Sequence, residues 1–139
     1  YAADRIDHLV NEVDGLCSAI DSGITVVSDR YYFSSYAYHS VDVDMGWVIQ
    51  ANALSAQLLR PTLTVFLDVP VDTALERIRK NRFVEEIFDQ EDRLRKTREL
   101  YFRAFERLEG VERVAVVDGA GTQDEVSARI WAAVEPCFR

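Results

Sequence analysis

The sequence contains few residues of the types that form disulfides or interrupt regular secondary structure. It contains two cysteines, three prolines, six glycines and one methionine in 139 residues. No apolar run approaches the roughly 20 residues that a membrane-spanning helix needs, so we expect no membrane partner. No secretory or transit pattern opens the chain, and the expected location is cytoplasmic. Cys17 and Cys137 each fall on the apolar face of an expected helix, which predicts buried free thiols rather than a disulfide or a metal pair.

Positive charge is also scarce. The 16 lysines and arginines are outnumbered by 24 acidic residues, and the net charge is −8. This balance disfavours nucleic acid and anionic membranes as partners. A small phosphorylated ligand is still compatible with it, because such a ligand responds to a local arginine cluster more than to distant surface charge. The apolar content of 48% supports a packed core, and the length predicts a single domain over residues 1–139.

Hydrophobic periodicity predicts strands that alternate with helices. The expected helices cover residues 2–20, 46–59, 71–80, 92–108 and 124–137, and the expected strands cover residues 24–27, 63–67 and 114–117. Residues 31–44 read as a loop with a helical turn. The strands are continuous apolar runs, which is typical of strands covered on both faces. We therefore expect an α/β fold with a parallel sheet in three layers, flanked by helices.

The segment Asp29-Arg30-Tyr31 directly follows the first expected strand. The carboxyl end of a strand is where open α/β sheets bind ligands. An arginine offers a planar fork for phosphate or carboxylate, and the hydroxyls and rings that follow suit a polar, planar ligand. The alternative is a salt bridge at a strand end beside ordinary loop aromatics.

Several stretches, in order and over nearly the whole chain, resemble the thymidylate kinase family of the P-loop nucleoside monophosphate kinases. They are Tyr1-Ala-Ala-Asp4-Arg5, Asp29-Arg30-Tyr31 followed by Ser34-Ser35-x-Ala37-Tyr38, Pro61-x-Leu-Thr-Val-Phe-Leu-Asp68-Val-Pro70, Ala74-Leu-Glu-Arg77-Ile-Arg79, and Phe88-Asp89 followed by Arg98 and Tyr101. The resemblance implies transfer of the γ-phosphate of Mg-ATP to dTMP, which gives dTDP. It also implies a P-loop NTPase-like fold, and the family commonly forms homodimers.

The resemblance also implies roles for single residues on the dTMP side. At the base, Tyr1 would stack on the pyrimidine and Arg5 would donate to a base carbonyl. At the phosphate, Arg30 would bind the acceptor phosphate and Asp29 would organise Mg²⁺ through water. The base and sugar would be lined by Ser34, Ser35 and Tyr38, and Phe88 would lie near the nucleoside. Asp29 and Arg30 are the catalytic candidates.

On the ATP side, the implied residues come from a short lid at about residues 79–91 and from a turn near the C-terminus. Arg77, Arg79 and Arg82 are the candidates to approach ATP when the lid closes, and Ala120 and Gly121 match the turn beside adenine.

Most of these residues have a simpler alternative. Tyr1 is equally well explained as a frayed terminus, and Arg5 as a solvated helix charge. The arginines of residues 77–82 are explained as a solvated helix end, and Asp68 as a cap for the helix at residue 71. Core packing explains Tyr101, Phe102 and Phe105, and a plain turn explains Asp118-Gly119.

The sequence departs from the family pattern in three places. It contains no G-x-x-x-x-G-K phosphate loop, so we expect an incomplete fold, the C-terminal two-thirds of the family's, that is inactive as a fragment. His39 stands where Gln is common, and Ile87 stands where some relatives carry a lid arginine. Two other functions therefore stay open: a kinase for another nucleotide or nucleoside, and a non-catalytic nucleotide-binding module.

Overall fold

The computed structural model describes residues 2–81 and 87–138, apart from the side chains of residues 79–81 and 87–90. These residues form two compact units. Unit 1 comprises residues 1–60 together with 100–104, and unit 2 comprises residues 61–99 together with 105–139.

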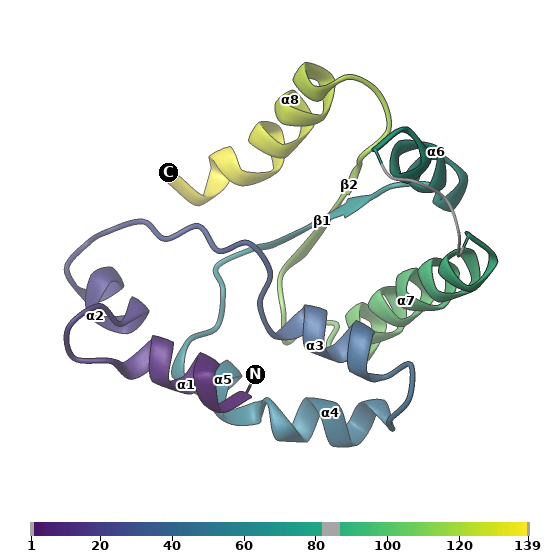
Figure 1. Cartoon of the computed structure of the whole chain (residues 1–139). Coiled ribbons are helices and arrows are strands. Elements are labelled where there is room, and N and C mark those ends of the chain that lie inside the picture. Colours follow the sequence, from purple (N-terminus) through teal and green to yellow (C-terminus); the bar gives the residue numbers. More distant parts are fainter. Residues whose placement is uncertain (1, 82–86, 139) are drawn as a thin grey trace. The chain divides into compact units, whose positions relative to one another are not determined.

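Unit 1 is helical (Figure 1). Its helices are α1 (Ala2–Val10), α2 (Leu16–Asp21), α3 (Tyr32–His39), α4 (Met45–Ala51) and α5 (Ala53–Leu58). Helix α1 packs against α2 and α5, and α3 packs against α4. The two long helices expected at residues 2–20 and 46–59 are each broken. At the first break, the Asn11 side chain accepts hydrogen bonds from the backbone N–H of Val13 and Asp14, a local turn that competes with the helix. At the second break, Asn52 separates α4 from α5.

Helix α3 provides much of the core of unit 1. Tyr32, Phe33 and Tyr36 are almost fully buried. The Tyr36 ring lies 5.4 Å from both the Tyr32 ring and the Phe33 ring, measured between centroids. The sequence predicts only a loop with a helical turn here, because aromatic and hydroxyl residues have modest helix propensity. Burial of the aromatic face outweighs that propensity.

The strand predicted at residues 24–27 is wrong. These residues form no strand in the described part of the chain, and Ile24 and Val27 are 57% and 92% exposed. Their β-branched side chains favour extended backbone, but a strand also needs a hydrogen-bonded neighbour. No described segment supplies one.

Unit 2 contains the sheet. Its elements are β1 (Thr64–Asp68), α6 (Val71–Asn81), most of α7 (Ile87–Arg107), β2 (Val114–Asp118), α8 (Gln123–Val134) and the short 3₁₀ helix η1 (Glu135–Phe138). The two strands are parallel, with Asp68 in register with Asp118, and α8 packs against β2 (Figure 1). The predicted α/β class with a parallel sheet and flanking helices is confirmed, although the sheet has two strands rather than three.

The two cysteines, Cys17 and Cys137, are free as predicted, but each is only half-buried. Among the described residues, no helix is long and apolar enough to cross a membrane.

Candidate functional site

The loop before α3 holds Arg30 in a left-handed backbone conformation. Its φ is 66°, the one positive φ among the described non-glycine residues, and this conformation is disfavoured for a side chain with a Cβ. The Ser28 hydroxyl donates to the Arg30 carbonyl at 2.9 Å. The Arg30 guanidinium carbon lies 5.1 Å from the centre of the Tyr38 ring. Contact through the ring face leaves N–H donors of this exposed cation for an anionic ligand.

Tyr101 of α7 supports this arrangement through the Tyr38 ring. The Tyr101 and Tyr38 rings meet edge to face, with centroids 6.2 Å apart. The Tyr101 hydroxyl also forms a 2.9 Å hydrogen bond with the Ser34 hydroxyl. Burial raises the pKa of the Tyr101 phenol, so the neutral form is favoured. Tyr101, which the sequence suggested as a core residue, thus connects Ser34 with Tyr38, and Tyr38 in turn contacts Arg30.

Arg5 of α1 belongs to a second polar cluster in unit 1. Its guanidinium donates to the Ser35 hydroxyl at 2.9 Å and to the Asn52 side-chain carbonyl. The same guanidinium lies 5.5 Å from the centre of the Tyr31 ring. Asn52 is buried and is itself fixed by donating to the Val48 carbonyl at 2.8 Å. Arg5 is therefore a half-buried, braced cation rather than a solvated helix charge.

Tyr31 ties this cluster to α5. Its hydroxyl lies 3.1 Å from the Ser55 carbonyl oxygen and 3.1 Å from the Leu59 carbonyl oxygen, so that it can donate to either. The tyrosine of Asp29-Arg30-Tyr31 therefore has a structural role, whereas Asp29 and Arg30 are exposed.

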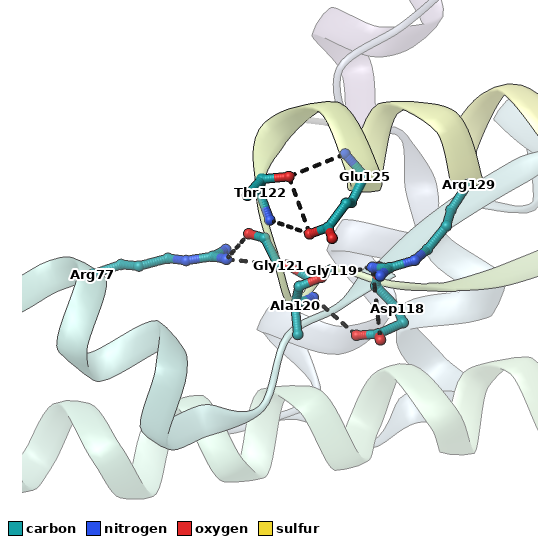
Figure 2. Close-up of polar contacts among 8 residues, drawn as sticks. All are labelled: Arg77, Asp118, Gly119, Ala120, Gly121, Thr122, Glu125 and Arg129. Carbon is teal, nitrogen blue, oxygen red and sulfur yellow. Dashed lines mark hydrogen bonds and ion pairs between the residues drawn. The ribbon is translucent and has the colours of Figure 1, made fainter.

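A third cluster surrounds the turn that follows β2, in unit 2 (Figure 2). Arg77 of α6 donates to the carbonyls of Gly119 and Gly121 at 3.2 and 3.5 Å. Arg129 of α8 donates to the carbonyls of Asp118 and Ala120 at 2.9 and 2.6 Å. The structure thus brings together three residues predicted for the ATP side, Arg77, Ala120 and Gly121.

Asp68, at the end of β1, has a different partner from the predicted one. Its two carboxylate oxygens accept from Nε and an Nη of Arg98 at 2.6 and 2.7 Å. The carboxylate is therefore engaged by a two-point ion pair rather than by a helix cap, and its hydrogen bond raises the pKa of Arg98. A helix cap was the expected role because Asp68 lies only three residues before α6.

The remaining predicted residues lie outside what the structure describes. Tyr1 and Arg82 are not described, nor are the side chains of Arg79 and Phe88, so most of the expected lid falls outside the described residues.

The described residues contain no group of three or more His, Cys, Asp or Glu side chains that could hold a metal ion. Mg²⁺ in phosphoryl-transfer sites is commonly held by one or two carboxylates together with substrate phosphates. A single exposed carboxylate such as Asp29 fits that pattern, with the nucleotide supplying most ligands.

Sequence reasoning missed two residues of these clusters, Asn52 and Arg129. Asn52 offered a weak signal, because asparagine has a low helix propensity and stands inside an expected helix. Arg129 offered none, because an arginine on a helix with exposed acidic neighbours reads as a solvated charge.

The parallel strands and flanking helices of unit 2 define a protein of the α/β class, in which the carboxyl ends of the strands are the usual place for a ligand. The chain matches the family model for thymidylate kinase over residues 1–130. The chain therefore belongs to the thymidylate kinase family, and the resemblance read from its motifs is confirmed.

Similar proteins carry that name. The chain is 34% identical to a thymidylate kinase of Synechococcus sp. (strain JA-2-3B'a(2-13)), over 98% of the chain and 64% of the relative. It is 36% identical to a thymidylate kinase of Syntrophotalea carbinolica, over 94% of the chain and 62% of the relative. It is 31% identical to a probable thymidylate kinase of Thermococcus onnurineus, over 97% of the chain and 62% of the relative. The chain thus spans less than two-thirds of the length of these relatives.

Proposed function

We propose that the protein carrying this chain transfers the γ-phosphate of ATP to dTMP and releases dTDP. The observation that carries the proposal is the exposed Arg30 guanidinium, which follows Asp29 in the chain and lies over the Tyr38 ring, 5.1 Å from its centre. A fixed, exposed cation of this kind suits the phosphate of a nucleoside monophosphate. Membership of the thymidylate kinase family makes dTMP the first monophosphate to test.

Phosphoryl transfer depends mainly on positioning and on charge neutralisation. In the proposed mechanism Arg30 binds the acceptor phosphate and limits its motion. Asp29 would take part in holding Mg²⁺ through water, and the metal when bound would neutralise charge on the ATP phosphates. Ser34, Ser35 and Tyr38 line the nucleoside.

Arg5 is the proposed donor to the base. Ser35 and Asn52 each accept one hydrogen bond from it, which fixes the guanidinium and leaves further N–H donors. Such preorganisation lowers the ordering cost of binding a base carbonyl. Tyr1 and Phe88 stay proposed as ring contacts to the nucleoside. On the ATP side, Arg77, Arg79 and Arg82 are proposed for the phosphates and for lid closure, and Ala120 and Gly121 for adenine.

The proposal extends to the setting of the protein. We propose ATP and dTMP as its small-molecule partners, a cytoplasmic location, and a homodimer as its assembly. Nucleic acid is not proposed as a partner, because a net charge of −8 opposes it.

The test is a substrate panel on the full-length gene product with Mg-ATP. We expect the rate of phosphorylation of dTMP to be well above the rates for dUMP, dCMP and thymidine. A coupled assay for ADP measures these rates. Equal rates on all four would replace dTMP kinase by a broader nucleotide kinase. Absence of turnover with retained ATP binding would replace it by a non-catalytic nucleotide-binding module.

A substitution at Arg30 tests whether its guanidinium contributes to the activity. Arg30→Ala removes a charge-assisted hydrogen bond worth roughly 1.5–3 kcal/mol, so we expect kcat/KM for dTMP to fall by about ten- to a hundredfold. Arg60→Ala, a change in another exposed arginine of unit 1, serves as the control. Unchanged kinetics in Arg30→Ala would remove Arg30 from the site.

A further inference from the structure

The turn after β2 has an unusual hydrogen-bond pattern. Each of the four successive carbonyls of residues 118–121 accepts from an arginine side chain, Asp118 and Ala120 from Arg129, and Gly119 and Gly121 from Arg77. Alternate carbonyls therefore accept from the same arginine, and each guanidinium holds two of the four. Figure 2 shows the two guanidinium groups on opposite sides of the turn.

Arg129 holds the turn through one nitrogen of its guanidinium. A single nitrogen, Nη1, donates to both the Asp118 and the Ala120 carbonyls, at 2.9 and 2.6 Å, which uses both of its hydrogens. The same nitrogen lies 3.7 Å from the Asp118 carboxylate. That carboxylate in turn accepts from the Ala120 N–H at 2.9 Å.

The rest of the turn is equally fixed. The Gly119 N–H donates to the Asp68 carbonyl at 2.9 Å, and a Cβ at Gly119 would lie 2.6 Å from the Val69 side chain. Thr122 and Glu125 form a capping box at the start of α8. Between these fixed points Gly119 is buried, and Ala120 and Gly121 present only backbone and one methyl group, which makes a narrow wall without long side chains.

We propose that Arg129 is a positioning residue that holds this turn as the wall for the purine base of the phosphoryl donor. The proposal rests on the proposed function and deepens it. A flat, neutral base fits a wall without projecting side chains, and a wall that is already rigid avoids the ordering cost of binding. Arg129 acts on the donor only through the turn, so its effect falls on the base and not on the phosphates.

The test compares Arg129→Ala and Arg129→Lys with wild type in the full-length protein. We expect Arg129→Ala to raise KM for ATP by about fivefold to tenfold, the effect of losing roughly one net hydrogen bond, with kcat and KM for dTMP little changed. Arg129→Lys keeps the charge and donors and should recover part of the loss. Arg107→Ala, a change in another exposed arginine of unit 2, is the control and should behave as wild type.

Two inhibitors separate positioning of the base from a general loss of structure. Inhibition by ADP, which has the base, should weaken in Arg129→Ala, whereas inhibition by inorganic tripolyphosphate, which lacks it, should not. Equal weakening of both, or an unchanged KM for ATP, would overturn the inference. A protein that binds ATP without phosphorylating dTMP would overturn the proposed function alone, and ATP affinity in the same variants would then test the role of Arg129.

Discussion

The guanidinium carbon of Arg30 lies over the ring of Tyr38, 5.1 Å from the ring centre. A free arginine side chain loses about 2 kcal/mol of rotamer entropy when it is ordered. Here part of that cost is met before any ligand binds, because Tyr38 sits on α3 and Tyr101 contacts its ring. The pair therefore links a rigid helix to a cation in an exposed loop.

This link predicts that the Tyr38 ring, more than its hydroxyl, sets the affinity for the acceptor. An exposed cation–π contact is worth about 0.5–1 kcal/mol, so Tyr38→Leu should raise KM for dTMP by roughly two- to fivefold. Tyr38→Phe keeps the ring and should stay close to wild type. Initial rates at varied dTMP and saturating ATP measure both. Equal KM values for the Leu and Phe variants would show that the ring does not position Arg30.

Asn52 is expected to contribute strongly to stability. It is buried, accepts from Arg5 and donates to the Val48 carbonyl. Asn52→Ala leaves these partners without it in a poorly solvated site, so the free energy of unfolding should fall by about 1–3 kcal/mol. Urea denaturation measures the change. Gln57→Ala on the exposed face of α5 is the control and should change stability by less than about 0.5 kcal/mol.

The sequence predicted the elements of unit 2 more closely than those of unit 1. The strands at residues 64–68 and 114–118 are continuous apolar runs that pair with each other, so their local pattern and their tertiary contacts agree. The run at residues 24–27 has the same local pattern without a described partner and forms no strand. Helix α3 shows the opposite outcome: its aromatic and hydroxyl residues predicted a loop with a helical turn, and tertiary burial makes them a helix.

The residues of the candidate site also differ in how far the sequence predicts them. Arg30, Ser34 and Tyr38 were predicted from the resemblance to the thymidylate kinase family, and the structure gives Arg30 and Tyr38 a direct contact. The residues that hold other parts of the clusters gave less signal: Asn52 is 47 residues from Arg5 and gave only a weak one, and Arg129 gave none. A single sequence records which side chains carry chemistry better than it records which ones brace them.

Tyr101 predicts a specific dependence of stability on alkaline pH. Burial raises the pKa of its phenol in the folded protein above the ordinary value of 10.0. A raised pKa contributes stability that is fully present below pH 10 and is lost as pH rises through the higher, folded value. Wild type should therefore lose stability relative to Tyr101→Phe above about pH 10, measured by denaturation across that range. An unchanged difference between the two proteins would contradict a buried, neutral phenol.

Gly121 is expected to tolerate no side chain, for two separable reasons. Its φ is 106°, and a Cβ there would lie 2.5 Å from the Glu125 carboxylate that closes the capping box. Gly121→Ala should therefore add backbone strain of about 1–3 kcal/mol and also weaken the cap, worth roughly 1 kcal/mol. Gly110→Ala is the matched control, because Gly110 has a φ of 77° and a Cβ there would meet nothing within 4 Å. Chemical denaturation should show a larger loss for Gly121→Ala than for Gly110→Ala. Equal losses would mean that Glu125 moves aside freely, and that the start of α8 does not depend on this turn.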